Sequence, residues 1–302
     1  MFFYSLNDYL KSTFGEKVYK LSLSLGTTCP NRDGRVGVGG CIFCSKVGSG
    51  DFAEASNLKV SEQIEAAKLR VKSKISSNKY IAYFQSFTST YVPLETLERA
   101  LTEAINHPDI VAVSIATRPD CLPDEVISLL NKLNKIKPIW VELGLQTIHK
   151  ETADYIRRGY DLSVFDKAVK TLKGINLNVI VHMIIGLPGE TNEMIFETAK
   201  YIGDSGADGI KLQLLHILKG TDLEKDFFNN KFTLPSLHEY AEIVVGCIKV
   251  LPKEMVIHRI TGDGNKRELI APLWSGDKKY VYQYLMDYFN KIDLVQGSKI
   301  KK

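Results

Sequence analysis

The sequence predicts an α/β protein whose parallel strands curl into a partial (β/α)6 barrel, followed by a C-terminal extension. Six short β-rich apolar runs occur before residue 220, and loops and amphipathic helical stretches lie between them. Crossovers of this kind return the chain to the same end of a sheet, so the strands are expected to pair in parallel. No G-x-G-x-x-G sequence follows the first run, which argues against a doubly wound dinucleotide-binding sheet.

The expected elements follow one another in a regular order. The strands are expected at Lys20–Leu25, Tyr80–Gln85, Ile110–Thr117, Ile139–Gln146, Asn178–Gly186 and Gly209–Leu218. The helices are expected at Ser61–Ser76, Pro93–Asn106, Pro123–Leu133, Lys150–Arg157, Leu162–Lys173 and Thr191–Ser205. In a barrel of this kind the chemistry lies at the carboxyl ends of the strands.

The pattern loosens after Gly220. A strand-like run at Met255–Ile260 and a helix near Lys278–Tyr288 are assigned to the extension. The expected organisation is an N-terminal segment at 1–17, a barrel core at 18–220 and an extension at 221–302 that covers the barrel.

Composition sets broad limits on the function. The chain has 302 residues, of which 44% are hydrophobic and 25% charged, enough for one large domain or two ordinary ones. No apolar run reaches about 18 residues, and the first residues lack the pattern of a cleaved leader. We therefore expect a soluble cytoplasmic protein without a membrane partner. The net charge of +4 is compatible with RNA binding but does not require it.

Three of the five cysteines form the strongest motif. Cys29, Cys41 and Cys44 follow the first predicted strand with the spacing C-x11-C-x2-C, in a glycine-rich loop. A structural zinc site normally uses four protein ligands, whereas a catalytic metal site leaves one position open. The alternative is a zinc loop with a distant fourth ligand. The other two, Cys121 and Cys247, are expected to be buried thiols, because so few cysteines argue against a disulfide framework.

A three-cysteine loop after the first barrel strand resembles the radical S-adenosylmethionine (radical SAM) superfamily. The resemblance implies a [4Fe–4S] cluster on Cys29, Cys41 and Cys44, with S-adenosylmethionine bound to the fourth iron through its amino and carboxylate groups. It also implies cleavage of that cofactor to a 5′-deoxyadenosyl radical, with electrons from a low-potential donor such as flavodoxin or ferredoxin. The usual spacing in the superfamily is C-x3-C-x2-C, so the loop geometry here is expected to differ while the ligand count is kept.

The fourth predicted strand carries two polar residues on one face. Glu142 and Gln146 are four positions apart, so their side chains point the same way from an apolar strand. The stretch from Trp140 to Tyr160 resembles the Elongator-catalytic-subunit group and the oxygen-independent coproporphyrinogen dehydrogenases. That resemblance implies cofactor binding here, with Gln146 on the ribose and Arg158 on the carboxylate. The alternative for Glu142 is a buried structural partner.

The end of the fifth predicted strand and the turn after it read His182-Met-Ile-Ile-Gly186-Leu-Pro-Gly-Glu-Thr191. This resembles the superfamily motif that packs against the adenine, which implies close approach at Gly186 and a polar ribose contact from His182. A histidine satisfied within the core is the alternative for His182. Thr191 is the expected N-cap of the next helix.

Two further strand ends complete the predicted cofactor site. Gln85 and Thr88 follow the second strand, where the superfamily usually has a Gly-Gly-Glu-type motif, but the acidic residue is missing here. Thr117, in Thr-Arg-Pro-Asp after the third strand, matches a similar stretch in the Elongator-like group.

Unassigned polar residues lie after the sixth strand and in the extension. His216, Lys219, His258, Arg259 and Asp263 form a mostly basic set near Trp274, which would suit an anionic substrate such as a carboxylate or phosphate. The alternative is a solvated loop with ordinary ion pairs.

Longer stretches narrow the resemblance to one group of the superfamily. CPNRDGRVGVGGCIFCS, ELGLQTIH, LHILKGT and IHRITGDG are similar to the YhcC/YtqA type, which has been associated under the name MnmL with the wobble uridine of transfer RNA. This implies conversion of 5-carboxymethylaminomethyl uridine to 5-aminomethyl uridine, with transfer RNA as partner. The alternatives are the same radical acting on a small metabolite or tetrapyrrole, and a zinc-containing RNA-binding module.

Overall fold

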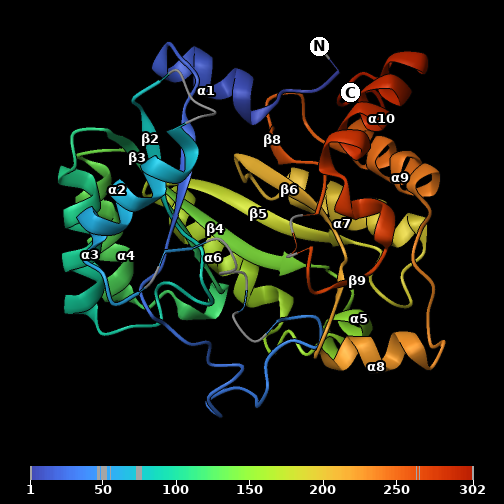
Figure 1. Cartoon of the computed structure of the whole chain (residues 1–302), viewed down its shortest axis with the longest axis horizontal. Helices are drawn as coiled ribbons and strands as arrows, with labels where there is room; N and C mark the ends of the chain where they lie inside the picture. Colours follow the sequence, from blue (N-terminus) through green and yellow to red (C-terminus); the bar gives the residue numbers. More distant parts are fainter. Residues whose placement is uncertain are drawn as a thin grey trace.

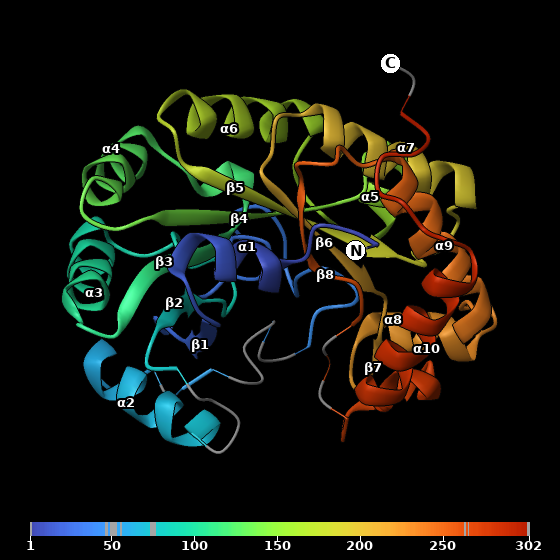
Figure 2. The ribbon, with the colours of Figure 1, turned by 90° about the horizontal axis from the view of Figure 1, so that it is seen from above.

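A seven-stranded parallel sheet forms the centre of the molecule (Figure 1). The computed structural model describes residues 2–45, 48, 53–54, 56–72, 77–262, 264 and 266–300. The strands lie in the order β1-β2-β3-β4-β5-β6-β8, and every neighbouring pair is parallel. Their bounds are β1 Tyr19–Leu23, β2 Tyr80–Phe84, β3 Ile110–Thr117, β4 Ile139–Gln146, β5 Asn178–Ile185, β6 Gly209–Leu214 and β8 Val256–Arg259. Seen from above, the sheet curls into a half-barrel with helices outside it, which confirms the predicted fold class (Figure 2).

The helices form the outer layer because one face of each carries the apolar residues. In α3 (Leu94–Asn106), Leu97, Leu101 and Ala104 recur at helical spacing and are fully buried against the sheet. The helices that alternate with the strands are α2 Val60–Val71, α3, α4 Asp124–Asn134, α5 Lys150–Tyr155, α6 Leu162–Gly174 and α7 Asn192–Asp204. Thr191 caps α7 by accepting a hydrogen bond from the Met194 amide, as predicted. Of the described helices, none combines the length and apolar character that crossing a membrane requires.

The C-terminal part contributes to the barrel itself. The predicted strand at Met255–Ile260 is β8, which pairs in parallel with β6 as a seventh barrel strand. The run predicted as one strand at Gly209–Leu218 is divided, since β7 (Ile217–Leu218) leaves the sheet and pairs antiparallel with β9 (Leu269–Ala271). The remaining helices are α8 Asp222–Phe228, α9 Leu237–Val250 and α10 Lys278–Lys291.

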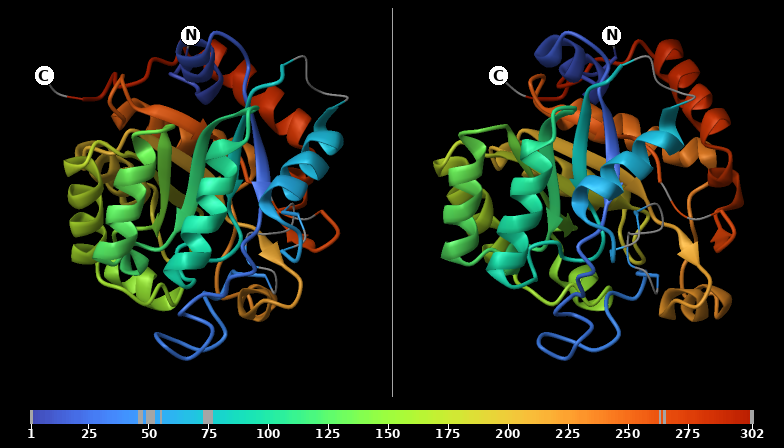
Figure 3. Two further views of the ribbon diagram at one scale, coloured as in Figure 1. Left: turned by 90° about the vertical axis from the view of Figure 1, so that its left-hand side faces the viewer. Right: turned by 60° about the vertical axis from the view of Figure 1, so that its left-hand side comes forward.

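The N-terminal helix α1 (Leu6–Phe14) closes one end of the barrel. Leu10 packs with Ile81, Trp140 and Ile180, which come from three different strands. Both views in Figure 3 place α1 at one end of the molecule and the loop after β1 at the other. The carboxyl ends of the strands are therefore the end at which a site can open.

Candidate functional site

One cavity of about 280 Å³ brings most of the predicted site residues together at the carboxyl ends of the strands. Its lining includes the three cysteines Cys29, Cys41 and Cys44. It also includes nine predicted cofactor or substrate residues: Gln85, Thr88, Thr117, Glu142, Gln146, Arg158, His182, His216 and Arg259. The whole lining draws residues from six strands of the barrel sheet, β2, β3, β4, β5, β6 and β8, which thus converge on the cysteine loop.

Three predicted residues lie away from this cavity. Gly186 has a φ of +89° and faces Pro235, so a Cβ there would lie 3.4 Å from the proline ring. Lys219 is exposed beyond β7, where its amide donates to the carbonyl of Glu268. His258 packs edge-on against Trp140 near the start of β4, because alternation along β8 turns it away from the side chain of Arg259. Asp263 lies outside the described residues.

The cysteine loop is held by polar side chains of its own. Arg32 donates from Nη2 to the carbonyls of Cys44 (3.2 Å) and Ser45, and its guanidinium lies over the ring of Phe87. Gly40 has a φ of +88°, and a Cβ at this position would lie 2.9 Å from Nε of Arg32. Only glycine therefore lets the backbone pass so close to this arginine just before Cys41.

A second arginine, Arg118, lies beside the cysteines and was not predicted as a site residue. It forms a two-pronged ion pair with Asp120, at 2.9 and 2.7 Å, and donates to the carbonyl of Arg158. Burial raises the pKa of the Cys41 thiol to about 11, with a further contribution from Cys44, while Arg118 acts in the opposite direction. The Thr-Arg-Pro-Asp stretch was the sequence signal for this arginine. Because a proline commonly ends a strand at such a position, the stretch alone does not specify a binding site.

Gln146 has the features of a ligand-binding residue. It lies at the end of β4 with a φ of +70°, a conformation that non-glycine residues rarely adopt. Its Oε1 atom is buried and has no hydrogen-bond partner among the described residues, although the side chain lines the cavity. A buried amide oxygen without a partner costs free energy, so a ligand that donates a hydrogen bond there would be favoured.

Arg158 is fixed by backbone carbonyls rather than by an acid. Its guanidinium donates to the carbonyls of Leu145, Thr147 and Tyr160 and stacks on the ring of Tyr160. No ion pair with a described carboxylate forms, so the positive charge lies at the cavity wall without a counterion there. This placement is compatible with the predicted carboxylate contact.

Glu142 occupies the centre of the barrel and is fully buried. Its Oε1 accepts from Nζ of Lys20 and from Oγ of Ser114, both at 2.6 Å. Its Oε2 accepts from Nε2 of His182 at 2.6 Å and from Nζ of Lys211. Burial alone would raise the pKa of this carboxyl, but Lys20 and Lys211 hold it well below its usual range. A carboxylate with four donors has no acceptor site left, so the structure supports the buried structural role for Glu142.

His182 is kept neutral by its surroundings. Burial lowers its pKa to about 4, with a further contribution from Lys211 that outweighs the hydrogen bond to Glu142. Since Nε2 faces the carboxylate, the proton lies on Nε2 and Nδ1 remains as an acceptor. A hydroxyl group of a ligand could donate to that atom.

His216 projects into the cavity between two glycines. Cβ atoms at Gly262 and Gly264 would lie 2.4 and 2.5 Å from its imidazole ring, so the ring fits only because both positions lack a side chain. Its Nε2 atom is buried without a partner among the described residues. Burial lowers the pKa of His216 to about 4.

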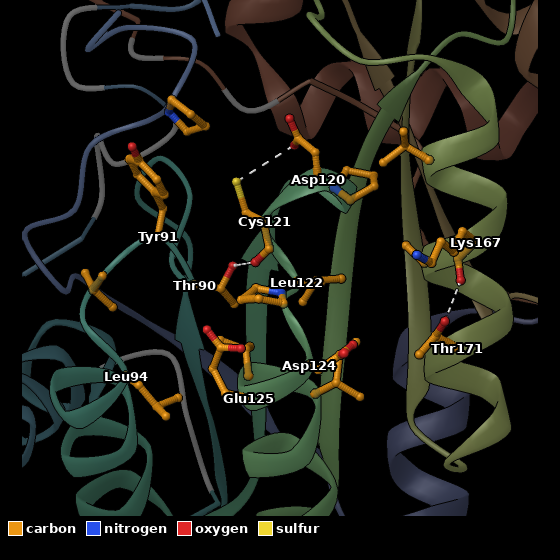
Figure 4. A pocket seen from close by; sticks show the side chains of 18 of the residues that line it. Thr90, Tyr91, Leu94, Asp120, Cys121, Leu122, Asp124, Glu125, Lys167 and Thr171 are labelled. Carbon is orange, nitrogen blue, oxygen red and sulfur yellow. Dashed lines mark hydrogen bonds between the residues drawn. The ribbon is translucent and has the colours of Figure 1, made fainter. Parts of the chain in front are cut away.

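A larger cavity of about 780 Å³ lies on the outer side of the cysteine loop, between that loop and helices α3, α4 and α6 (Figure 4). Its lining contains none of Cys29, Cys41 or Cys44. Cys121 lies there with its thiol directed toward Asp120, and Thr90 donates to the carbonyl of Cys121. The smaller cavity, which holds the three-cysteine loop, is therefore the candidate site.

Comparison with known proteins identifies the family. The radical SAM superfamily model matches residues 23–202, and the radical SAM C-terminal domain model matches 207–291. The chain belongs to the radical SAM superfamily. The YtqA protein of Bacillus subtilis, which is uncharacterised, is 44% identical over 276 residues, covering 91% of this chain and 86% of that protein.

Two further similarities are more distant. A transfer RNA uridine(34) acetyltransferase of Methanocaldococcus jannaschii is 30% identical over 177 residues, covering 57% of this chain and 32% of that protein. The solved structure of Elp3 from Methanocaldococcus infernus has a TM-score of 0.68 at 21% identity, covering 92% of this radical SAM chain. The chain spans 64% of that Elp3 chain, which is less than two thirds.

The residues of this radical SAM enzyme fit the cofactors that the superfamily implies. Ligands of a single zinc ion lie about 4 Å apart, given zinc–sulfur bonds of about 2.3 Å. Among the described residues, the group whose ligand atoms approach within 4.8 Å of one another is Glu65, His107 and Asp109, not the three thiols. The wider spacing of Cys29, Cys41 and Cys44 suits a larger cluster, and the unpartnered Oε1 of Gln146 suits a hydrogen-bonding cofactor.

Proposed function

We propose that this enzyme modifies the wobble uridine of transfer RNA, converting 5-carboxymethylaminomethyl uridine to 5-aminomethyl uridine. The observation that carries the proposal is the similarity to a transfer RNA uridine(34) acetyltransferase, which extends over 57% of the chain. Position 34 is the wobble position. The motif resemblance described above points to the same nucleoside.

In this proposal the chain's own residues prepare and confine the reaction. A [4Fe–4S] cluster with S-adenosylmethionine would supply a 5′-deoxyadenosyl radical to remove a hydrogen atom from the carboxymethyl CH2. Return of one electron to the cluster would leave an imine at that carbon, and its hydrolysis by water would break the C–N bond, releasing the two-carbon unit as glyoxylate and leaving the 5-aminomethyl group. Cys29, Cys41 and Cys44 would hold the cluster, while Gln146 and Arg158 would bind the cofactor. His182 offers Nδ1 as an acceptor, because its Nε2 atom donates to Glu142. The closed end of the barrel beneath α1 excludes water from below the cavity.

The proposed chemistry requires reducing conditions and an electron donor. A three-cysteine cluster is exposed to oxidants at its open iron, so we expect a cytoplasmic setting in which thiols stay reduced. The electron comes from a low-potential donor such as flavodoxin or ferredoxin. Transfer RNA is the second partner.

The direct test is a single-turnover reaction under anaerobic conditions. Reconstituted protein is incubated with S-adenosylmethionine, dithionite and transfer RNA that carries 5-carboxymethylaminomethyl uridine, and the nucleosides are analysed by mass spectrometry. We expect 5-aminomethyl uridine together with 5′-deoxyadenosine. The variant Cys41→Ala should yield neither product, whereas Cys247→Ala, a buried thiol in α9, should yield both.

Two results would count against the proposal. Formation of 5′-deoxyadenosine with an unchanged nucleoside, and no salt-sensitive binding of transfer RNA, would favour a small metabolite or tetrapyrrole as substrate. One tightly bound zinc per chain without iron–sulfur absorption would favour a zinc-containing RNA-binding module.

A further inference from the structure

Each strand of the barrel contributes one polar side chain to a single layer in its interior, which we call the polar belt. Its members, in strand order from β1 to β8, are Lys20, Tyr83, Ser114, Glu142, His182, Lys211 and Arg259. The register pairs Tyr83 with Ser114, and Lys211 with both His182 and Arg259. Hydrogen bonds from Lys20, Ser114, His182 and Lys211 to Glu142 join the remaining strands to the layer. Interior layers of such barrels are usually filled with bulky apolar side chains. A polar layer from seven strands therefore indicates a binding function.

The belt carries more positive than negative charge. Lys20 and Lys211 together place two ammonium groups against Glu142, whose four acceptor sites they share with Ser114 and His182. Glu142 is the single carboxylate among the described residues that line the cavity. Buried charges are stable only when they are paired. The belt is thus suited to receive one further anion.

Lys211 is the member best placed to bind that anion. Its Nζ atom contacts Glu142 and lies 3.0 Å from the hydroxyl of Tyr83, while the side chain also lines the cavity. Burial lowers the pKa of Lys211 to about 7. Glu142 raises this pKa, whereas the positive charges of Lys20 and Arg259 lower it further. An anion beside Lys211 would offset both lowering effects and favour its charged form.

The carboxylate of Glu142, which Lys211 contacts, lies below Gln146, the residue expected to contact the cofactor's ribose. Glu142 precedes Gln146 by four residues on β4, which corresponds to about 13 Å along a strand. A cofactor that binds the cluster through its amino and carboxylate groups keeps that carboxylate near the cysteines. An anion at the belt would therefore belong to the substrate, and the cavity of about 280 Å³ admits a small branch rather than a nucleic-acid backbone.

We propose that Lys211, with Arg259 beside it, binds a carboxylate group of the substrate and so determines which substrates the enzyme accepts. Carboxylate oxygens match the single strong donor of a lysine and the fork of an arginine. This inference rests on the proposed function for the identity of the reaction and names the chemical group that the same site selects.

The experiment measures binding of nucleosides that differ in one group. Equilibrium dialysis with reconstituted holoenzyme and saturating S-adenosylmethionine compares 5-carboxymethyluridine with its amide, 5-carbamoylmethyluridine. Uridine 5′-monophosphate is the third probe, since its charge lies on the ribose. We expect the acid to bind at least about tenfold more tightly than the amide or the monophosphate in the wild type. In Lys211→Met the preference for the acid should fall to less than about threefold.

Two further variants guard against a folding defect. The double variant Lys211→Met/Glu142→Gln removes the ammonium group and the carboxylate of this pair together, and its amide oxygen remains as an acceptor for Lys20. It should lose the preference in the same way. Lys200→Met, which alters an exposed ion pair with Asp204 on α7, should keep the wild-type preference.

Three outcomes would overturn the inference. They are absence of binding of the acid to the wild type, equal binding of acid and amide, and an acid preference that survives in both Lys211 variants. Loss of S-adenosylmethionine binding in these variants would also overturn it, because the belt would then hold the cofactor's carboxylate. The proposed function fails separately, when the acid preference is present but transfer RNA is not converted.

Discussion

His182 donates a hydrogen bond from Nε2 to Oε2 of Glu142 over 2.6 Å, in the interior of the barrel. The contact joins neighbouring strands β4 and β5 and fixes the tautomer of the imidazole. It also makes the histidine one of four donors to the same carboxylate. The stability of the barrel and the chemistry of its cavity are therefore linked through Glu142.

Removal of Glu142 should destabilise the fold strongly. Glu142→Ala leaves Lys20 and Lys211 buried without their counterion, and we expect the free energy of unfolding to fall by about 3–5 kcal/mol. Urea denaturation measures the change. The control Glu98→Ala breaks an exposed pair with Lys132 and should cost at most about 1 kcal/mol. Similar losses in both variants would show that Glu142 has no special role.

Stability should decrease as the pH falls below neutrality. The pKa of His182 is about 4 in the folded protein and about 6.5 in an unfolded chain, so the unfolded state takes up its proton first. The free energy of unfolding should therefore fall as the pH is lowered from about 6.5 toward 4. The contribution of His182 to this loss should reach about 2 kcal/mol by pH 5.

The histidine can be tested by substitution. His182→Gln can still donate to Glu142 but does not titrate, so its denaturation midpoints at pH 7 and pH 5 should differ less than those of the wild type. The control is His238→Gln, at an exposed histidine that contacts Tyr284. Its denaturation midpoints at pH 7 and pH 5 should differ by as much as those of the wild type. His216 also has its pKa lowered by burial, to about 4, so part of the pH dependence should remain. An unchanged difference in His182→Gln would contradict the assignment.

Gln146→Ala should weaken the binding of S-adenosylmethionine without unfolding the protein. The variant removes the unpartnered Oε1 atom, and loss of one hydrogen bond corresponds to an increase in Kd of about tenfold. Equilibrium dialysis of the anaerobic protein measures it. Gln283→Ala, which removes an exposed amide bonded to Asp287, should leave Kd unchanged. Equal Kd values for the two variants would remove Gln146 from the cofactor site.

Substitutions at two neighbouring glycines of the cysteine loop distinguish the effect of backbone strain from that of a steric clash. Gly39 and Gly40 both have positive φ angles, but a Cβ at Gly39 meets nothing within 4 Å, whereas one at Gly40 meets Arg32. Gly39→Ala should cost about 1–2 kcal/mol of backbone strain and keep the iron content. Gly40→Ala should displace Arg32 and lower the iron bound after reconstitution, measured by metal analysis. Equal iron contents in the two variants would show that Arg32 does not position the loop.

The sequence predicted the barrel because hydrophobic periodicity is a local property. Alternation of strand and helix over Lys20–Leu218 was sufficient for parallel pairing. The short run at Met255–Ile260 was placed in the extension, because its pairing with β6 is a contact between distant parts of the chain. The cysteine loop was also visible, since its three thiols lie within 16 residues.

The polar belt was decided by the tertiary structure alone. Lys20 and Lys211 lie 191 positions apart, and each looked like an ordinary lysine in an apolar strand. The curl of the sheet and its register bring both ammonium groups to Glu142. The same geometry turned His258 toward Trp140 while Arg259 entered the cavity. Sequence determines which side chains share a face of one strand, but only closure of the barrel determines which faces meet.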